Sequence, residues 1–166
     1  MPQLSKKMSG ALNDQVNLEL ASAYVYLSMS AYCAEVNLKG AASWLRIQWG
    51  EELEHATKLI DYIGGRGGSV TLKAIAQPAG KFDSLLDVFE QVLAHEQKVT
   101  AAIHKICDLA VAEKDYASQA LLQWYVSEQV EEENSPAEII SMLRLVGDSG
   151  AALLMVDRQL AERGRE

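Results

Sequence analysis

The chain has 166 residues, of which 49% are hydrophobic, and a formal net charge of -8. This length fits one domain with a sizeable core, and this hydrophobic content excludes a disordered chain. The acidic balance argues against a nucleic-acid partner, because binding phosphate backbones requires clustered Lys and Arg. It suits solubility or the gathering of cations.

The first residues, MPQLSKKMSGALND, contain no apolar signal-peptide segment. The longest apolar run near the other end, Ala151 to Val156, is too short to span a bilayer. Cys33 and Cys107 lie far apart and form no CxxC pair, so we expect two reduced core thiols. These features predict a cytoplasmic protein with one domain over residues 1–166 and no membrane partner.

Gly, Asn and Pro residues divide the chain into four long predicted helices and a short fifth. The predicted helices cover about residues 5–36, 41–63, 83–113, 116–147 and 149–163. Within the first, Leu12, Val16 and Leu20 recur at helical spacing. Ser149 is a candidate N-cap of the last. Pro136 stands inside the fourth, and because apolar spacing resumes directly after it, we expect a kink there and not a break.

Residues 65–82 have no helical pattern, and a loop of this length needs a geometric reason. A second helix of about 23 residues is roughly 35 Å long. About 18 extended residues reach up to roughly 60 Å, so this loop can run the whole length of a helical bundle. The second and third helices are then parallel. The predicted fold class is all-α, a ferritin-like four-helix bundle with a long crossover between helices two and three, plus a short C-terminal fifth helix.

Candidate metal ligands occur in the middle of all four long helices. Glu52 and His55 are three residues apart on the second helix and share one face, which by itself is a weak signal. The other helices supply Glu19, Glu96, Gln129 and Glu132. Burying several carboxylates costs several kcal/mol for each ion and adds repulsion, unless cations neutralise them.

These ligand types predict the kind of metal. Oxygen ligands with one imidazole suit iron better than metals that prefer thiolates. A carboxylate from each of two helices, with Glu-x-x-His-type pairs on the other two, is the di-iron bundle pattern. The chain departs from the symmetric form of that pattern, because Gln129-x-x-Glu132 stands where a second Glu-x-x-His occurs.

Five stretches, in this order and spacing, resemble prokaryotic non-haem ferritins: NLELASAYVYLSMSAYC, GAASWLR, EELEHATKLIDYI, AHEQ and LLQWYVSEQ. The resemblance covers nearly the whole chain. It implies a ferroxidase centre in which one iron is held by Glu19, Glu52 and His55. Glu52 would bridge to a second iron, whose other ligands would be Glu96 and Glu132, with Gln129 close by. It also implies a homo-oligomeric 24-subunit shell whose four-fold channels are lined by the fifth helix.

Two aromatic residues have open interpretations. Tyr26 lies seven residues after Glu19 on nearly the same helical face, as a packed core tyrosine would. The resemblance favours a tyrosine beside the di-iron centre that supplies an electron during oxygen reduction. Trp124 matches a second such aromatic, with a redox role and plain packing both open. His95 and His104 receive no role, because a lone His next to a ligand position is usually a solvated surface residue.

The resemblance also bears on haem and on the path of iron. In bacterioferritins a Met directly after the bridging Glu ligates haem, and Leu53 stands at that position here, so no haem is expected there. Animal ferritins place two carboxylates in the three-fold channel. The corresponding residues here are Gln119 and Leu122, which leaves the iron route open.

Three more acids, Glu51, Glu128 and Glu131, are each rotated about 100° from a residue that faces the bundle centre. They form a predicted second carboxylate cluster on the flank, which Glu132 could also reach. Solvated acids on an exposed helix face are the competing interpretation. In the resembling ferritins these positions hold a third iron that faces the cavity, so the resemblance implies a third iron site.

The predicted function is iron storage with oxidation of Fe(II) to Fe(III) by O2 or H2O2 at the paired site, followed by deposition as ferric mineral. One alternative is a shell subunit without ferroxidase activity, which would lack His55 and several carboxylates. Another is a di-iron oxidase or peroxidase of the rubrerythrin type. That protein would carry a second Glu-x-x-His and often a Cys-rich electron-transfer domain.

Overall fold

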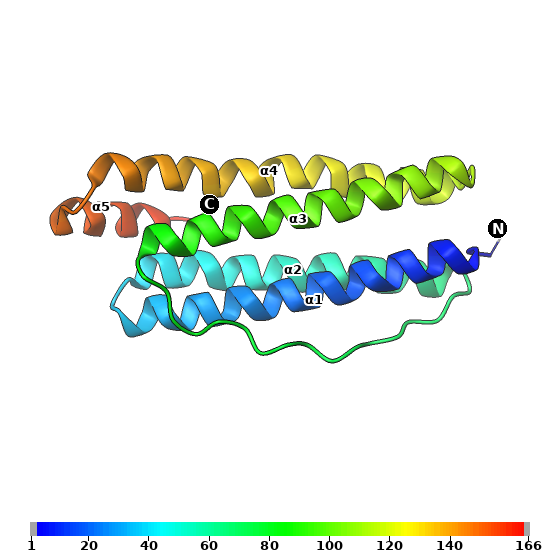
Figure 1. Cartoon of the computed structure of the whole chain (residues 1–166), viewed down its shortest axis with the longest axis horizontal. Coiled ribbons are helices and arrows are strands. Elements are labelled where there is room, and N and C mark those ends of the chain that lie inside the picture. Colours follow the sequence, from blue (N-terminus) through cyan, green and yellow to red (C-terminus); the bar gives the residue numbers. More distant parts are fainter. Residues whose placement is uncertain (1–2, 165–166) are drawn as a thin grey trace.

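Five α-helices account for most of residues 3–164, the part of the chain that the computed structural model describes (Figure 1). They are α1 (Lys6–Glu35), α2 (Lys39–Gly65), α3 (Leu85–Ala112), α4 (Tyr116–Val146) and α5 (Gly150–Leu160). The all-α prediction is confirmed, and most predicted ends agree within about two residues. Within residues 3–164, no helix is long and apolar enough to cross a membrane.

Side-chain caps fix where four of the helices begin. In each case the cap accepts a hydrogen bond from the backbone N–H three residues further on. The four caps are Ser5, Ser84, Asp115 and Ser149. The predicted cap Ser149 is therefore confirmed. Helix α4 continues without a break through the buried Pro136, so the expected absence of a break is confirmed, and the kink stays a prediction.

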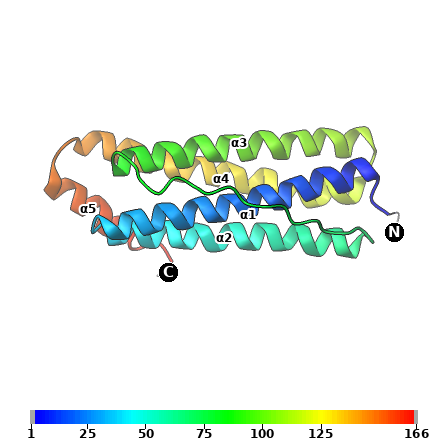
Figure 2. The ribbon, with the colours of Figure 1, turned by 60° about the horizontal axis from the view of Figure 1, so that its bottom comes forward.

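The connection between α2 and α3, residues 66–84, runs the length of the bundle along α1 (Figures 1 and 2). Helices α2 and α3 are therefore parallel, as its length predicts. Two asparagines of α1 hold this segment. The Asn13 amide donates to the Ser69 carbonyl at 3.0 Å, and its oxygen accepts from the Thr71 N–H at 2.7 Å. Asn17 repeats this pattern one helical turn later.

The bundle core consists of two apolar clusters. The first includes Tyr26, Trp44, Phe89 and Ile140, and the second includes Leu12, Leu59, Ile103 and Leu122. On each long helix, buried polar residues lie in the sequence between members of the two clusters. On α1, for example, Glu19 lies between Val16 of the second cluster and Tyr26 of the first. The fold thereby collects polar side chains in one layer of the bundle, between its apolar clusters.

Candidate metal centre

The layer between the apolar clusters contains all six residues of the predicted di-iron centre. Each is buried, with 1% to 7% of its surface exposed. The six are Glu19, Glu52, His55, Glu96, Gln129 and Glu132. They come from all four long helices, so the bundle itself fixes their mutual placement.

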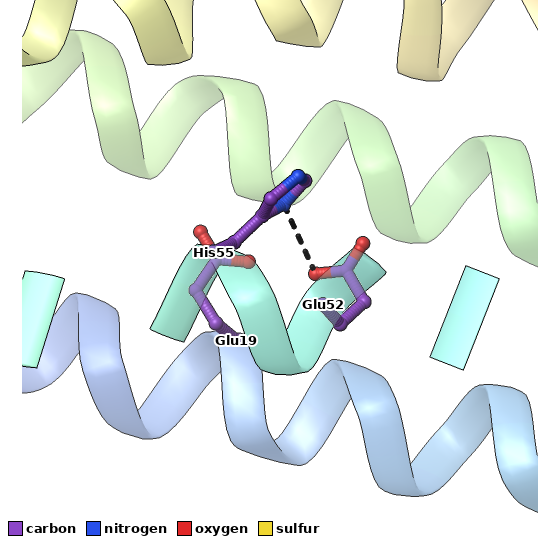
Figure 3. Close-up of side chains that lie close together, drawn as sticks. All are labelled: Glu19, Glu52 and His55. Carbon is purple, nitrogen blue, oxygen red and sulfur yellow. Dashed lines mark ion pairs between the residues drawn. The ribbon is translucent and has the colours of Figure 1, made fainter. Parts of the chain in front are cut away.

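Two groups of three candidate ligands share one residue. Glu19, Glu52 and His55 each offer a ligand atom within 4.8 Å of the others, and their side chains, from α1 and α2, come together in Figure 3. Glu52, Glu96 and Glu132 form the second group under the same limit. Because Glu52 belongs to both groups, its carboxylate is near enough to both to be shared between two neighbouring cations.

Amide and hydroxyl donors orient these carboxylates. The Gln15 amide donates to Glu19 at 2.8 Å. The Gln129 amide donates to Glu96 at 3.1 Å, and the Tyr26 hydroxyl donates to the other oxygen of Glu96. The acid cluster is thus ordered by the protein's own hydrogen bonds before any cation binds.

Burial dominates the electrostatics of the cluster. It raises the pKa of Glu19, and it raises that of Glu52 well above the usual carboxyl range, with help from the charge of Glu19. Burial likewise raises the pKa of Glu96 to about 7 and that of Glu132 to about 8. Protons therefore neutralise part of the cluster near neutral pH, and bound cations would take their place.

His55 is prepared as a neutral ligand. Burial, and next the positive charge of Lys58, lower its pKa to about 4. Its Nδ1 lies 3.8 Å from a Glu52 oxygen (Figure 3), but an uncharged imidazole forms no ion pair at neutral pH. The Tyr125 hydroxyl donates to the backbone carbonyl of His55 at 2.7 Å and fixes this turn of α2. A neutral imidazole is the form that binds metals.

Both predicted aromatic residues lie against the candidate ligands. Tyr26 is fully buried, and its hydroxyl contacts Glu96 directly. Trp124 stacks edge-on against the ring of His55, with 5.3 Å between centroids, and is 37% exposed. The Lys58 ammonium lies 3.7 Å from the centroid of the Trp124 ring. Trp124 therefore touches a ligand ring on one side and solvent on another, which fits either open interpretation.

The three acids predicted to form a second cluster on the flank, Glu51, Glu128 and Glu131, do not all have the same kind of partner. The Glu51 carboxylate accepts a hydrogen bond from Arg163 at 2.6 Å. Glu128 forms a candidate ligand group with His55 and Glu132, within 4.8 Å. Burial, and next the charges of Glu131 and Glu51, raise the pKa of Glu128, so the three acids do influence one another.

Sequence reasoning missed several residues of this layer. Gln15 and Gln48 each lie one helical turn before a ligand Glu, a spacing that could have indicated their role as donors. The expectation that His95 is a solvated surface residue is wrong. Its Nε2 lies 2.7 Å from the Ser22 hydroxyl, and its ring stacks edge-on against Tyr26. His104 is exposed, as expected.

Gln119 and Leu122 stand at the positions that carry carboxylates in the three-fold channel of animal ferritins, and both have structural contacts within the subunit. The Gln119 amide donates to the Ala110 carbonyl at 3.1 Å, which closes the turn between α3 and α4. Leu122 is packed in the second apolar cluster. The described part of this single chain therefore identifies no acidic path for iron at these two residues.

The fold and the central layer together define a class, an all-α four-helix bundle with a carboxylate-rich candidate metal centre. Comparison with known proteins gives the family, since residues 9–146 match the model of the ferritin-like domain. A bacterial non-heme ferritin of Campylobacter jejuni is 41% identical over 157 residues, which cover 95% of this chain and 94% of that protein. One of Escherichia coli is 38% identical over 158 residues, covering 95% and 96%.

A solved structure is similar over the same extent. The chain superposes on a ferritin of Archaeoglobus fulgidus, described as a novel open pore ferritin, with a TM-score of 0.96 and 48% identity. The match covers 98% of this chain and 99% of that one. The chain belongs to the ferritin family, and its resemblance to prokaryotic non-haem ferritins is confirmed.

Proposed function

We propose that this chain is an iron-storage ferritin subunit that oxidises Fe(II) at a di-iron ferroxidase centre. Family membership supports iron storage. The observation that carries the ferroxidase proposal is the sharing of Glu52 between two candidate ligand groups. A carboxylate common to two sites brings two Fe(II) ions close enough to give their electrons to one oxidant molecule.

In this mechanism the substrate iron binds in two places. Glu19, Glu52 and His55 hold one Fe(II), and Glu52, Glu96 and Glu132 hold the other, with Gln129 close by. Anionic oxygen ligands favour Fe(III) over Fe(II), which lowers the cost of oxidation. Two Fe(II) ions supply the two electrons that reduce O2 to H2O2 with two protons, or H2O2 to water. When only one Fe(II) is available to reduce H2O2 to water, Tyr26, whose hydroxyl contacts Glu96, would supply the second electron together with its hydroxyl proton, and a later Fe(II) would restore the tyrosine.

The products then move to storage. We propose that 24 subunits form a hollow shell and that Fe(III) leaves the centre, hydrolyses and deposits as ferric mineral inside it. A net charge of -8 on each subunit favours accumulation of cations at such a shell. A cytoplasmic location and the absence of a nucleic-acid or membrane partner remain predictions. The absence of haem also remains a prediction, based on Leu53 at the position after Glu52.

The test counts the iron that is oxidised quickly. Protein freed of iron is titrated with Fe(II) under anaerobic conditions and then mixed with O2 in a stopped-flow instrument. We expect about two Fe(II) ions per subunit to be oxidised in the fast phase. Glu52→Ala should abolish the fast phase and leave the shell assembled, because it removes a buried acid from a cluster whose members repel one another when charged.

The matched control is Glu54→Ala, which removes an equal charge from an exposed position of the same helix. It should oxidise iron like the natural chain. A fast phase that survives in Glu52→Ala would contradict the ferroxidase proposal and favour a shell subunit without this activity. Size-exclusion chromatography separates the rubrerythrin-type alternative, because a shell elutes at several hundred kilodaltons and a dimer does not.

A further inference from the structure

A buried glutamine connects the candidate metal centre to the C-terminal segment. Gln48 is 1% exposed, and its amide nitrogen donates to Glu52 at 3.3 Å and to Glu132 at 2.5 Å. Its amide oxygen accepts from the Arg163 guanidinium at 3.0 Å. One side chain therefore contacts a carboxylate of α2, a carboxylate of α4 and the residues that follow α5.

The neighbours of Gln48 allow only one orientation of its amide. Rotated by 180°, the amide would present its oxygen to two carboxylates and its NH2 group to a guanidinium that has only donors. The face toward Arg163 would then be repulsive in every protonation state, and the face toward Glu52 and Glu132 would be repulsive once bound cations replace the protons of these acids. Arg163 thus fixes which end of the amide faces Glu52 and Glu132, and so holds two donors against the candidate ligands.

Arg163 follows α5 in the chain, and several contacts hold its side chain in place. Its guanidinium lies 4.2 Å from the centroid of the Trp44 ring and donates to the Trp44 carbonyl at 3.3 Å. It also donates to Glu51 at 2.6 Å. Charge, stacking and hydrogen bonding all keep the guanidinium beside Gln48.

We propose that Gln48 and Arg163 are positioning residues of the metal centre, with Arg163 acting through Gln48. This inference rests on the proposed function, since it takes Glu52 and Glu132 as ligands. Each amide N–H occupies one carboxylate lone pair and leaves the others directed toward the cations. Hydrogen-bond partners behind metal ligands typically matter by about 10-fold to 100-fold in affinity.

The test uses Co(II), which binds oxygen and imidazole ligands, reports coordination through its visible spectrum and is not oxidised by air at such sites. Co(II) is titrated into the assembled, iron-free protein and into three variants: Gln48→Leu, Arg163→Met and the double variant. We expect Gln48→Leu to weaken Co(II) binding by about 10-fold or more and to alter the spectrum. Arg163→Met should weaken it by about five-fold, the effect of one lost hydrogen bond.

Two results separate a positioning role from a purely electrostatic one: the direction in which Co(II) affinity changes, and the coupling between the two substitutions. Removing a positive charge strengthens cation binding if charge alone matters, so a weaker Arg163→Met variant supports positioning. If Arg163 acts through Gln48, the double variant binds Co(II) as Gln48→Leu does. The control Arg158→Met removes an equal charge from an exposed position of α5 and should leave the spectrum unchanged.

Three results would overturn the inference: unchanged or stronger binding in Arg163→Met, an equal loss of affinity from Arg163→Met in the Gln48→Leu background, or no loss in Gln48→Leu. Failure of the proposed function is a different outcome. In that case Co(II) would bind equally well to the natural chain and to Glu52→Ala. Helical circular dichroism and shell size are checked for every variant, and Gln48→Leu decides the matter if Arg163→Met does not assemble.

Discussion

The carboxylate of Asp157 in α5 accepts a hydrogen bond from the backbone N–H of Ala41 at 2.8 Å, and one from Gly40 at 3.0 Å. Helix α2 has no side-chain cap of its own, so Asp157 caps it from a distant part of the chain. A Cβ atom at Gly40 would lie 1.7 Å from the Asp157 carbonyl oxygen, which shows how closely α5 approaches α2 (Figure 2). This contact fixes α5, and with it Arg163, against the bundle.

The first prediction concerns this cap. Asp157→Ala should lower the free energy of unfolding by about 0.5 to 2 kcal/mol, because two N–H groups at a helix N-terminus lose their acceptor. The midpoint of denaturant unfolding of the iron-free protein measures the change. Asp148→Ala, at an exposed position before α5, is the control and should leave the midpoint nearly unchanged. Equal midpoints for the two variants would contradict the role of Asp157.

The second prediction is that the fold does not need metal. Two apolar clusters hold the four long helices together on either side of the acid layer, so chelated protein should keep its helical circular dichroism and its assembly. Small domains whose metal supplies the folding free energy behave in the opposite way. Loss of helicity on chelation alone would show that the metal centre is part of what folds the chain.

The third prediction is the pH dependence of that iron-free protein. The pKa of Glu132 is raised from 4.5 to about 8 and that of Glu96 to about 7, so the folded state holds protons that the unfolded state has lost. Their contribution to stability is present below pH 4.5 and is lost as the pH rises through 7 and 8. Burial lowers the pKa of His55 from 6.5 to about 4, so His55 has the opposite effect on stability. That effect is confined to pH values below 6.5.

Between pH 6.5 and 8.5, therefore, the raised carboxyl pKa values lower the unfolding midpoint as the pH rises, and the raised thiol pKa values of Cys33 and Cys107 add to the fall near pH 8.5. Glu132→Gln cannot ionise at this position, so the fall should be smaller in this variant. Groups on the surface contribute equally to both proteins, so the difference between their two curves reports Glu132 together with the part of the Glu52 shift that its charge causes. Parallel curves would mean that Glu132 titrates normally in the folded chain.

The fourth prediction separates electron supply by Tyr26 from its packing. Tyr26→Phe keeps the buried ring and removes the hydroxyl that donates to Glu96. Binding of Co(II) should weaken by at most about ten-fold, because Glu96 loses one hydrogen bond. With the candidate sites saturated with Fe(II), the fast oxidation should still be slower by about ten-fold or more, because the hydroxyl that supplies the electron is gone. Tyr24→Phe, on the same helix but 47% exposed, is the matched control. Equal oxidation rates in the two variants would leave Tyr26 with a packing role only.

The helices and the central acids could be predicted from the sequence because local signals specify them. Apolar spacing and the glycines after Ile63 mark the helix bodies and ends, and the length of the 66–84 connection requires parallel α2 and α3. Acids that stand among the apolar, core-facing positions at the middle of the long helices meet in the core once these helices pack. Glu19, Glu52 and Glu96 follow from that geometry.

Other contacts could not be predicted because their partners are far apart in the sequence. Asp157 caps a helix that begins more than a hundred residues earlier, and nothing near either residue signals the pairing. Arg163 reaches Glu51 only because α5 docks beside α2. His95 has a neighbour, Ser22, on another helix, so its partial burial does not follow from its own surroundings in the chain.

The last prediction concerns a third iron per subunit on the flank of the centre. Glu128 lies with His55 and Glu132 in a candidate ligand group, whereas Glu51 is paired with Arg163. A third ion would therefore depend most on Glu128, with Glu131 adding negative charge nearby. Glu128→Ala with Glu131→Ala should leave the first fast oxidation largely intact. It should change the ratio of iron oxidised to O2 consumed, or the rate of later additions.

Repeated additions of Fe(II) with an oxygen electrode measure this ratio. The control, Glu54→Ala with Glu138→Ala, removes the same charge from exposed positions of α2 and α4 and should match the natural chain. Glu128→Ala alone should account for most of the effect, because only Glu128 shares a ligand group with the centre. If the double variant matches its control through every addition, and crystals soaked in iron carry no metal beside Glu128, the flank acids are solvated surface residues and the third site does not exist.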